Sequence, residues 1–266
     1  MTDWAGDLEF AHALADAADV LSMARFHSDD LVVESKPDLT PVTDADRAVE
    51  RELREQLERE RPGDAVLGEE YGDTGDGSRR WVLDPIDGTK NYVRGVPVWS
   101  TLIALQQDER TVVGVVSAPA LGRRWWAAEG AGAWTGSSVR DARACHVSKV
   151  SALSDAYLAY SSLFGWERRD RLPQFIDLLR TVWRTRGFGD FWQHMMVAEG
   201  VVDVSCEPEV YLWDLAPLQI VVSEAGGRFS DLSGVDRTDG GSVVCSNGLL
   251  HDAVLEAIGT TSGPAA

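Results

Sequence analysis

Acidic residues directly follow apolar runs of this chain, and this placement limits its possible folds more than any other feature. Glu69 and Glu70 come after a Val-Leu-Gly run, and Asp84 and Asp87 come after a Trp-Val-Leu run. Such short runs, bounded by Gly, Asp and Pro, are typical of buried strands, so these acids are expected at the rim of a sheet. Asp214 opens a segment with the pattern of an amphipathic helix.

Convergence of these three segments would gather several carboxylates in one place. Like charges at short range raise carboxylate pKa values and cost stability unless cations neutralise them. Oxygen ligands suit a hard cation such as Mg²⁺, which keeps water and a bound phosphate in its shell. Each segment also has a purely structural explanation, because a lone Asp before a helix is usually an N-cap and a Glu pair after a strand is usually a solvated turn.

The 266 residues fit one two-lobed domain or two small domains. Helices are expected at residues 7–26, 44–61, 171–180, 191–199, 214–225 and 249–258. Strands are expected at residues 65–67, 81–83, 100–105, 111–117, 123–128, 156–161, 182–186, 201–206 and 241–245. This mixed order indicates an α/β or α+β fold of packed layers, without fixing the order of the strands.

The balance of 25 Lys and Arg against 43 Asp and Glu gives a net charge of −18. This charge disfavours binding to nucleic acid or to anionic lipid, both of which recruit basic faces. No apolar stretch approaches the roughly 18 residues of a membrane span, and the first residues are acidic where a signal peptide is basic. Three well-separated cysteines without a C-x-x-C pair argue against a zinc or disulfide framework and favour the cytoplasm.

Several common catalytic motifs are absent from the sequence. It contains no G-x-x-x-x-G-K-[ST] loop, no G-x-S-x-G nucleophile elbow, and no H-E-x-x-H pair among its five histidines. No side-chain nucleophile has a recognisable activating base, so covalent catalysis is not expected.

The D-P-I-D-G-T stretch at residues 84–89 is the most specific segment. Pro85 restricts the backbone of its neighbour, and the two Asp are placed to straddle a metal pair. Gly88 allows a phosphate to approach closely, and the amides of Gly88 and Thr89 can bind its oxygens if a helix begins here.

The wider segment at residues 81–92, W-V-L-D-P-I-D-G-T-K-N-Y, resembles a signature of the inositol monophosphatase superfamily of Mg²⁺-dependent, lithium-sensitive phosphatases. Residues 213–227, W-D-L-A-P-L-Q-I-V-V-S-E-A-G-G, resemble its second signature. G-E-E at residues 68–70 and V-T-D-A-D at residues 42–46 complete the set in order and spacing, so the resemblance covers nearly the whole chain. Three residues depart from those usual in the family: Lys90, Tyr92 and Pro217. None of these departures removes a metal ligand.

Three further stretches, at residues 36–50, 91–99 and 117–127, resemble the histidinol-phosphatase branch of this superfamily found in actinobacteria. That resemblance implies hydrolysis of L-histidinol phosphate to L-histidinol and phosphate in histidine biosynthesis. A broader inositol-1-phosphate or sugar-phosphate phosphatase is the alternative enzyme. A non-catalytic relative that keeps only the fold would require lost ligands, and all of them are present.

The resemblance implies a metal centre of two or three Mg²⁺ ions. Glu69, Asp84 and the carbonyl of Ile86 would hold the first ion. The second would be held by Asp84, Asp87 and Asp214, and Glu69 would reach a weaker third ion through water. Such a cluster supplies Lewis-acid chemistry to an in-line displacement, and its cations would attract an anionic substrate despite the net charge of −18.

The resemblance also assigns catalytic roles to Asp46, Thr89 and Glu69. Thr89, backed by Asp46, would orient the attacking water, and Glu69 would act from the metal centre. A structural role for Asp46 is equally open, because Thr43-x-x-Asp46 is a capping-box pattern.

Substrate choice is expected to depend on the C-terminal half. Glu207, seven positions before Asp214, matches the family residue that contacts substrate hydroxyls, and Asp190 aligns near another lining position. L-Histidinol carries an ammonium and an imidazole, so two carboxylates facing it would form charge-assisted hydrogen bonds. Alternatively, Asp190 only caps the helix that begins at Phe191. For Arg186 two roles are open, binding of phosphate or pairing with an acid. The expected substrate-binding residues are Asp87, Gly88, Thr89, Arg186, Gly189, Asp190, Glu207 and Asp214.

The family's fold would be an αβαβα layered sandwich, an α/β (α+β) architecture with two lobes in one domain of residues 1–266. The N-terminal lobe would cover residues 1–145 and the C-terminal lobe residues 146–260, with a frayed tail at residues 260–266. A cytoplasmic homodimer acting on a small-molecule phosphomonoester is expected. The Trp125-Trp126 pair would belong to the core or to a dimer contact.

Overall fold

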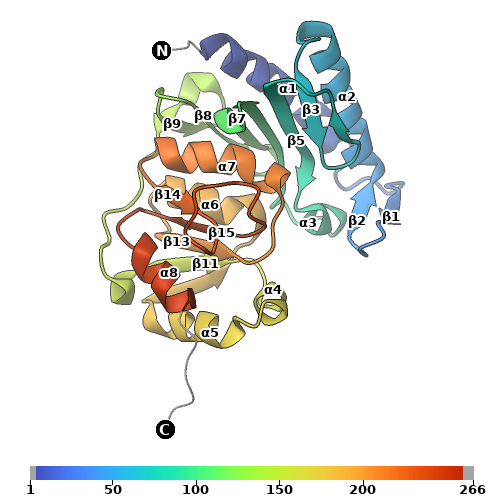
Figure 1. The fold of residues 1–266 in the computed structure, drawn as a ribbon. Coiled ribbons are helices and arrows are strands. Elements are labelled where there is room, and N and C mark those ends of the chain that lie inside the picture. Colours follow the sequence, from blue (N-terminus) through green and yellow to red (C-terminus); the bar gives the residue numbers. More distant parts are fainter. Residues whose placement is uncertain (1–3, 260–266) are drawn as a thin grey trace.

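Two β-sheets alternate with three layers of helices in the computed structural model of the chain, which describes residues 4–259 (Figure 1). The layers follow the order helix, sheet, helix, sheet, helix, so the αβαβα prediction is confirmed. The predicted frayed tail lies outside the described residues. No helix within residues 4–259 is long and apolar enough to cross a membrane.

The first sheet has eight strands in the order β10-β9-β8-β7-β6-β5-β3-β4. Only the β3–β5 pair is parallel, with Gly68 opposite Leu83. Glu69 and Asp84 therefore leave this pair at the same end. The strands are β3 (Ala65–Gly68), β4 (Gly72–Thr74), β5 (Arg79–Asp87), β6 (Ser100–Gln107), β7 (Arg110–Ala118), β8 (Arg123–Ala128), β9 (Ala133–Gly136) and β10 (Arg143–Ala144).

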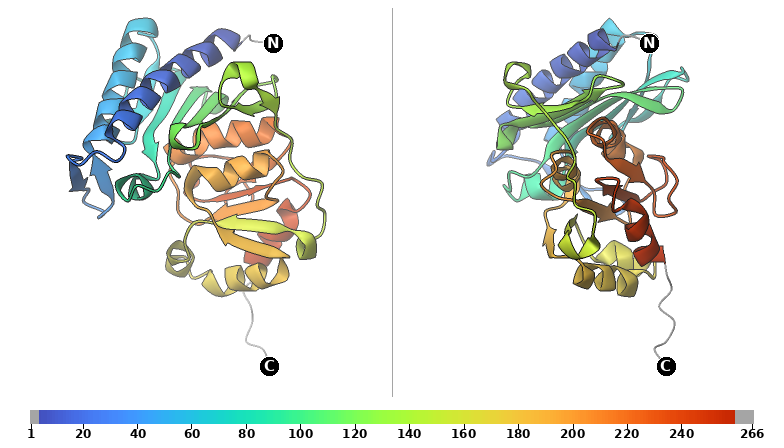
Figure 2. Two further views of the ribbon diagram at one scale, coloured as in Figure 1. Left: turned by 180° about the vertical axis from the view of Figure 1, so that it is seen from behind. Right: turned by 90° about the vertical axis from the view of Figure 1, so that its left-hand side faces the viewer.

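Helices α1 (Ala5–Arg25) and α2 (Asp44–Glu60) cover the outer face of this sheet, as the views in Figure 2 show. Val49, Leu53 and Leu57 recur at helical spacing on α2 and are fully buried in one cluster with residues of α1 and the sheet. The predicted apolar face of this helix is confirmed. Burial of that face holds α2 against the sheet, and it thereby fixes the position of Asp46 in the first turn of the helix.

The middle layer consists of α6 (Asp190–Ala198) and α7 (Leu212–Glu224), which lie between the two sheets (Figure 1). One buried cluster joins these helices to both sheets. The amphipathic pattern expected for α7 is wrong, because the helix is buried against a sheet on either side. Gly114 of β7 permits this approach: a Cβ there would lie 2.8 Å from the carbonyl oxygen of Pro217.

The second sheet has five strands in the order β12-β11-β13-β15-β14. Its strands are β11 (Tyr157–Tyr160), β12 (Arg184–Gly187), β13 (Val204–Glu207), β14 (Arg228–Ser230) and β15 (Val243–Ser246). The other face of this sheet shares a buried cluster with α4 (Phe164–Arg168), α5 (Leu172–Thr181) and α8 (His251–Gly259). The first sheet draws its strands from residues 65–144 and the second from residues 157–246. Helices α6 and α7 pack against both sheets, so the two lobes share one buried cluster. The lobe boundary at residue 145 therefore stays a prediction.

Several short elements have no counterpart in the sequence-based expectations. The strands β1 (Val33–Ser35) and β2 (Pro41–Thr43) form a hairpin beside α2, and α3 (Thr89–Val93) follows β5. Three 3₁₀ turns, η1 (Pro119–Leu121), η2 (Val139–Asp141) and η3 (Leu153–Asp155), complete the fold. Strand β5 also extends past its apolar run: Asp84 still pairs with Leu102, and the register shifts before Asp87. The two acids thus lie within the irregular end of the strand, not after it.

Trp125 and Trp126 on β8 are buried within this chain. Trp125 packs in the cluster between the sheets and Trp126 in the cluster under α1 and α2. They point to opposite faces of the sheet, as neighbouring residues of a strand must. Both therefore belong to the core of this chain.

Candidate active site

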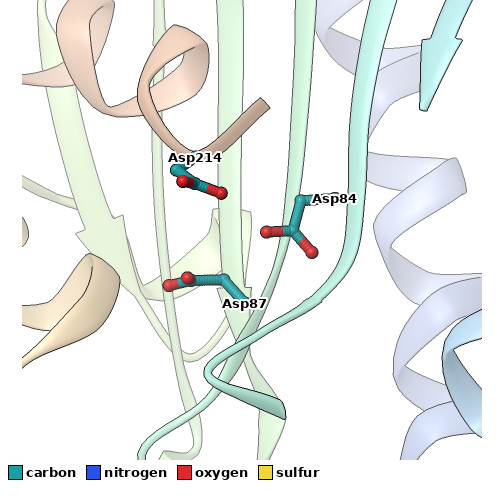
Figure 3. A group of neighbouring side chains, drawn as sticks. All are labelled: Asp84, Asp87 and Asp214. Carbon is teal, nitrogen blue, oxygen red and sulfur yellow. The ribbon is translucent and has the colours of Figure 1, made fainter. Parts of the chain in front are cut away.

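Three carboxylates converge where the first sheet meets the middle layer of helices. Asp84 and Asp87 come from the end of β5, and Asp214 comes from the first turn of α7 (Figure 3). Each offers a carboxylate oxygen within 4.8 Å of the other two. Figure 3 shows the three side chains directed toward one common space. Of the predicted metal ligands, the structure brings these three together.

Glu69 adds a fourth carboxyl group beside this cluster. It follows β3, where its backbone N–H donates to the carbonyl of Leu83, 3.2 Å away. Its side chain lies near enough to Asp84 to raise the pKa of that carboxyl group. The parallel pairing of β3 and β5 thus accounts for the juxtaposition that the sequence suggested.

Burial and mutual repulsion disfavour the charged forms of these acids. Burial raises the pKa of Asp84 well above its ordinary value, and Glu69, Asp87 and Asp214 raise it further. Burial likewise raises the pKa of Asp214 to about 8. The pKa of Asp87 is raised by burial and by Asp190 and Asp214. Acids so placed are ionised at neutral pH only beside compensating positive charge, and their all-oxygen donor set fits Mg²⁺.

Lys36 provides such positive charge, and sequence reasoning missed this residue. Its ammonium donates to Glu69 Oε1 at 2.8 Å and to Glu70 Oε1 at 2.6 Å. Burial disfavours the ammonium, but the hydrogen bonds to the two glutamates outweigh burial and raise the pKa of Lys36. The turn of the β1–β2 hairpin places it there, with its N–H donating to the carbonyl of Thr40. No motif in the sequence signals this long-range pairing.

Gly88 forms the turn between β5 and α3. Its φ of +85° lies in the left-handed region, and a Cβ there would lie 3.1 Å from the carbonyl oxygen of Val98 and 3.2 Å from Asp190 Oδ2. Only glycine meets both conditions without strain. A helix does begin at the next residue, Thr89, which is the condition expected from the sequence for phosphate binding by the amides of Gly88 and Thr89.

Thr89 and Asp46 meet beside the acid cluster, as the family pattern implied. Thr89 Oγ1 lies 3.3 Å from Asp46 Oδ1 and donates to the carbonyl of Ile86 at 3.0 Å. Asp46 Oδ2 accepts the N–H of Thr43 at 2.8 Å, completing a capping box at the start of α2. Asp46 therefore has the predicted structural role and also contacts Thr89, while its catalytic role stays a prediction. Burial raises its pKa to about 7.

Two cavities meet at the acid cluster, because both are lined by Asp190 and Asp214. The larger, of about 410 Å³, is also lined by Lys36, Gly88 and Thr89. The smaller, of about 160 Å³, is lined by His194, Phe191, apolar side chains and five acids. These acids are Asp87, Asp190, Glu207, Glu209 and Asp214. Tyr211 and Trp213 stack at the larger cavity with ring centroids 5.0 Å apart.

Asp190 does not cap α6, so that alternative is wrong. The helix begins at Asp190 itself, and the N–H of Phe191 donates to Asp87 Oδ2 at 2.8 Å. The Asp190 carboxylate instead accepts from Asn91 Nδ2 at 2.9 Å and faces both cavities. Burial and the neighbouring Glu207 raise the pKa of Asp190 to about 7.

Arg186 and Gly189 are predicted substrate residues that line neither cavity, and Arg186 lies on the sheet away from the site. It is exposed on β12, an edge strand of the second sheet, and its guanidinium donates to the carbonyl of Thr185. Its exposure on the sheet edge explains why it neither pairs with an acid nor faces the site. Gly189, with a φ of +80°, lies directly before α6 and lets the chain turn into that helix.

Sequence reasoning also missed Asn91, His194 and Tyr211. His194 carried a readable signal, since it stands four positions after Asp190 on an otherwise apolar helix, which places both on one face. Asn91 and Tyr211 lie next to recognised motifs but match no catalytic pattern.

Known proteins resemble this chain along almost its full length. The profile of the inositol monophosphatase family matches residues 3–261. The chain belongs to this family. It is 59% identical to a histidinol-phosphatase of Streptomyces coelicolor over 96% of this chain and 97% of that protein. It is 57% identical to a histidinol-phosphatase of Mycobacterium tuberculosis over 94% of this chain and 96% of that protein.

A solved structure extends the comparison to the fold of the family. The structure of an inositol monophosphatase from Zymomonas mobilis superposes with a TM-score of 0.85 at 30% identity, covering 98% of this chain and all of that one. The family assignment made from the sequence motifs is therefore confirmed, and the chain is a phosphoric monoester hydrolase of this family.

Proposed function

We propose that the chain is a Mg²⁺-dependent histidinol-phosphatase, which converts L-histidinol phosphate and water to L-histidinol and phosphate in histidine biosynthesis. The observation that carries the chemistry is the convergence of Asp84, Asp87 and Asp214 within 4.8 Å. The similarity to two histidinol-phosphatases at 59% and 57% identity supports the choice of substrate.

The acid cluster would hold two or three Mg²⁺ ions. Glu69, Asp84 and the carbonyl of Ile86 would bind one, and Asp84, Asp87 and Asp214 another. Bound Mg²⁺ supplies Lewis-acid polarisation of the phosphoryl group and lowers the pKa of water. The raised pKa values of Asp84 and Asp214 support this assignment, because a cation would relieve the repulsion among these buried acids.

Thr89 and Asp46 would orient the attacking water. The Thr89 hydroxyl can turn its single proton from the carbonyl of Ile86 to Asp46 and accept a hydrogen bond from water, which would direct a water lone pair toward phosphorus. The backbone amides of Gly88 and Thr89 would bind phosphate oxygens, since both residues line the larger cavity. Their contribution is positioning and stabilisation of developing charge.

The smaller cavity would receive the leaving group. Asp190 and Glu207 face it as acceptors, and an ammonium or imidazole N–H would donate to them in charge-assisted hydrogen bonds. Phe191, Leu215 and Leu218 supply an apolar surface suited to a flat ring. A neutral polyol would leave these carboxylates without cationic partners.

Phosphate release from a panel of substrates with Mg²⁺ tests this proposal. The panel contains L-histidinol phosphate, inositol 1-phosphate, fructose 1,6-bisphosphate and an adenosine bisphosphate. We expect the highest kcat/KM for L-histidinol phosphate, and rescue of a histidine auxotroph that lacks its histidinol-phosphatase. A higher kcat/KM for inositol 1-phosphate or a sugar phosphate would replace the proposal with the broader phosphatase.

The proposal includes a cytoplasmic homodimer. Three free, buried cysteines are compatible with a reducing compartment. Light scattering at several protein concentrations tests the dimer, and fractionation of the native host tests the location.

A further inference from the structure

Glu207 is held by three hydrogen-bond donors on the side of the protein interior. Ser161 Oγ donates to Oε2 at 2.7 Å, and Gln193 Nε2 and His194 Nε2 both contact Oε1. The residue is only 8% exposed. Such contacts fix the carboxylate plane, so the remaining lone pairs have a defined direction.

His194 is the centre of a buried chain of polar groups behind this carboxylate. It is 1% exposed, its Nε2 lies 3.1 Å from Glu207 Oε1, and its Nδ1 lies 2.8 Å from Ser205 Oγ. Ser205 is fully buried on β13, opposite Cys245 on β15. The chain thus runs from the second sheet through the imidazole to the edge of the smaller cavity.

The hydrogen-bond partners determine where the imidazole carries its proton. An ionised carboxylate only accepts, so Nε2 must donate to Glu207. The Ser205 hydroxyl can donate, and a single ring proton then satisfies both contacts with Nδ1 as the acceptor. In this arrangement a Nε2–H donor holds Glu207, and the remaining lone pairs of the carboxylate stay available to a ligand.

His194 also shares a helix face with Asp190, four positions earlier, and both line the smaller cavity. The two residues therefore approach one ligand space from one element. Asp190 can contact a leaving group directly, whereas the Nε2 of His194 is already engaged by Glu207.

We propose that His194 is a positioning residue that sets specificity for a cationic leaving group by orienting Glu207 through a Nε2–H donor. This inference rests on the proposed function, because it concerns the leaving-group side of the same site. His194 contacts neither the acids of the cluster nor Thr89, so we expect its substitution to act mainly on the recognition of L-histidinol.

Two matched variants test the inference in the full-length enzyme with Mg²⁺. His194→Leu removes the donor, and His194→Gln offers an amide N–H toward the position of Nε2. For His194→Leu we expect KM for L-histidinol phosphate and Ki for the product L-histidinol to rise about tenfold, since a hydrogen bond to a charged group is lost. We expect kcat and Ki for inorganic phosphate to change less than about twofold, and His194→Gln to restore most of the difference.

Three results would overturn the inference: an unchanged Ki for L-histidinol in His194→Leu, an equal rise of both product Ki values, or no recovery in His194→Gln. Failure of the proposed function would give a different result: the unsubstituted enzyme would release no phosphate from L-histidinol phosphate.

The tautomer is measurable without any variant. In ¹⁵N-labelled enzyme at neutral pH, we expect the ring nitrogens of His194 to show a protonated Nε2 and an unprotonated Nδ1 by their chemical shifts. A ring protonated on Nδ1, alone or together with Nε2, would overturn the assignment even if His194→Leu fails to fold.

Discussion

Asp87, at the end of β5, accepts the backbone N–H of Phe191 at the start of α6 across 2.8 Å, although 104 positions separate them in the chain. This contact joins the acid cluster to the helix that carries Asp190 and His194. This hydrogen bond, together with the buried cluster that packs α6 against both sheets, sets the distance between the proposed phosphate position and the leaving-group cavity. Movement of α6 would change both sides of the site together.

Asp84→Asn and Asp87→Asn should each abolish turnover while the fold persists. The asparagine keeps an oxygen acceptor for the N–H of Ile86 or of Phe191 but loses the charge that a cation needs. We expect kcat to fall by about 10³-fold or more with an unchanged circular dichroism spectrum. Asp177→Asn, an exposed acid on α5, is the control and should be fully active. Full activity in either cluster variant would refute the metal assignment.

The metal-free enzyme should lose stability as the pH rises from about 6.5 to 8.5. Unfolded carboxylates are already ionised in this window, whereas burial raises the pKa of Asp214 to about 8 and those of Asp46 and Asp190 to about 7. The folded state therefore binds more protons than the unfolded state, so stability falls with increasing pH. Buried His12 and His251, with pKa values near 4, titrate below this window.

Differential scanning fluorimetry in EDTA checks this pH dependence. We expect Tm to fall across the window and Mg²⁺ to reverse the fall, with a smaller slope in Asp214→Asn. A Tm that stays constant or rises over this pH range would show that repulsion among these carboxylates does not destabilise the folded enzyme.

Asp190→Asn should weaken the binding of L-histidinol phosphate without disturbing the backbone. The φ of Asp190 is +48°, a conformation that Asn tolerates. We expect KM to rise about tenfold through loss of a charge-assisted hydrogen bond, with a smaller change in kcat. Asp170→Asn, at an exposed position with a φ of +54°, controls for the backbone. Unchanged KM and kcat would remove Asp190 from the site.

Thr89→Val should lower kcat, whereas Thr89→Ser should retain most of it. Valine has the same shape but lacks the hydroxyl that lies 3.3 Å from Asp46 and 3.0 Å from the carbonyl of Ile86. Loss of an oriented water should lower kcat by about 10²-fold or more. Steady-state kinetics at saturating Mg²⁺ provides the measurement, and equal rates for the two variants would exclude the hydroxyl from catalysis.

The parts of the site that sequence patterns predicted are those encoded by local segments. Asp84 and Asp87 share one strand end, and Glu69 lies beside them because β3 and β5 pair in parallel. Asp214 was predicted from its motif, but its exact environment was not, since the burial of α7 between two sheets depends on residues far away in the chain.

The remaining contacts depend on long-range packing that no local pattern encodes. Lys36 reaches Glu69 through a short hairpin whose first strand is exposed and whose second strand ends in two buried residues, with no clear alternation of apolar and polar side chains. Arg186 was expected to bind phosphate or to pair with an acid, yet the edge position of β12 leaves it exposed. The pairing of His194 with Glu207 likewise arises only when α6 packs on β13.

A Mg²⁺ titration of the EDTA-treated enzyme, followed by phosphate release from L-histidinol phosphate, tests the central claim most directly. We predict no activity without the metal, saturable recovery as Mg²⁺ is added, and no recovery in Asp84→Asn at any Mg²⁺ concentration. Activity that persists in EDTA, or that returns equally in Asp84→Asn, would contradict the account.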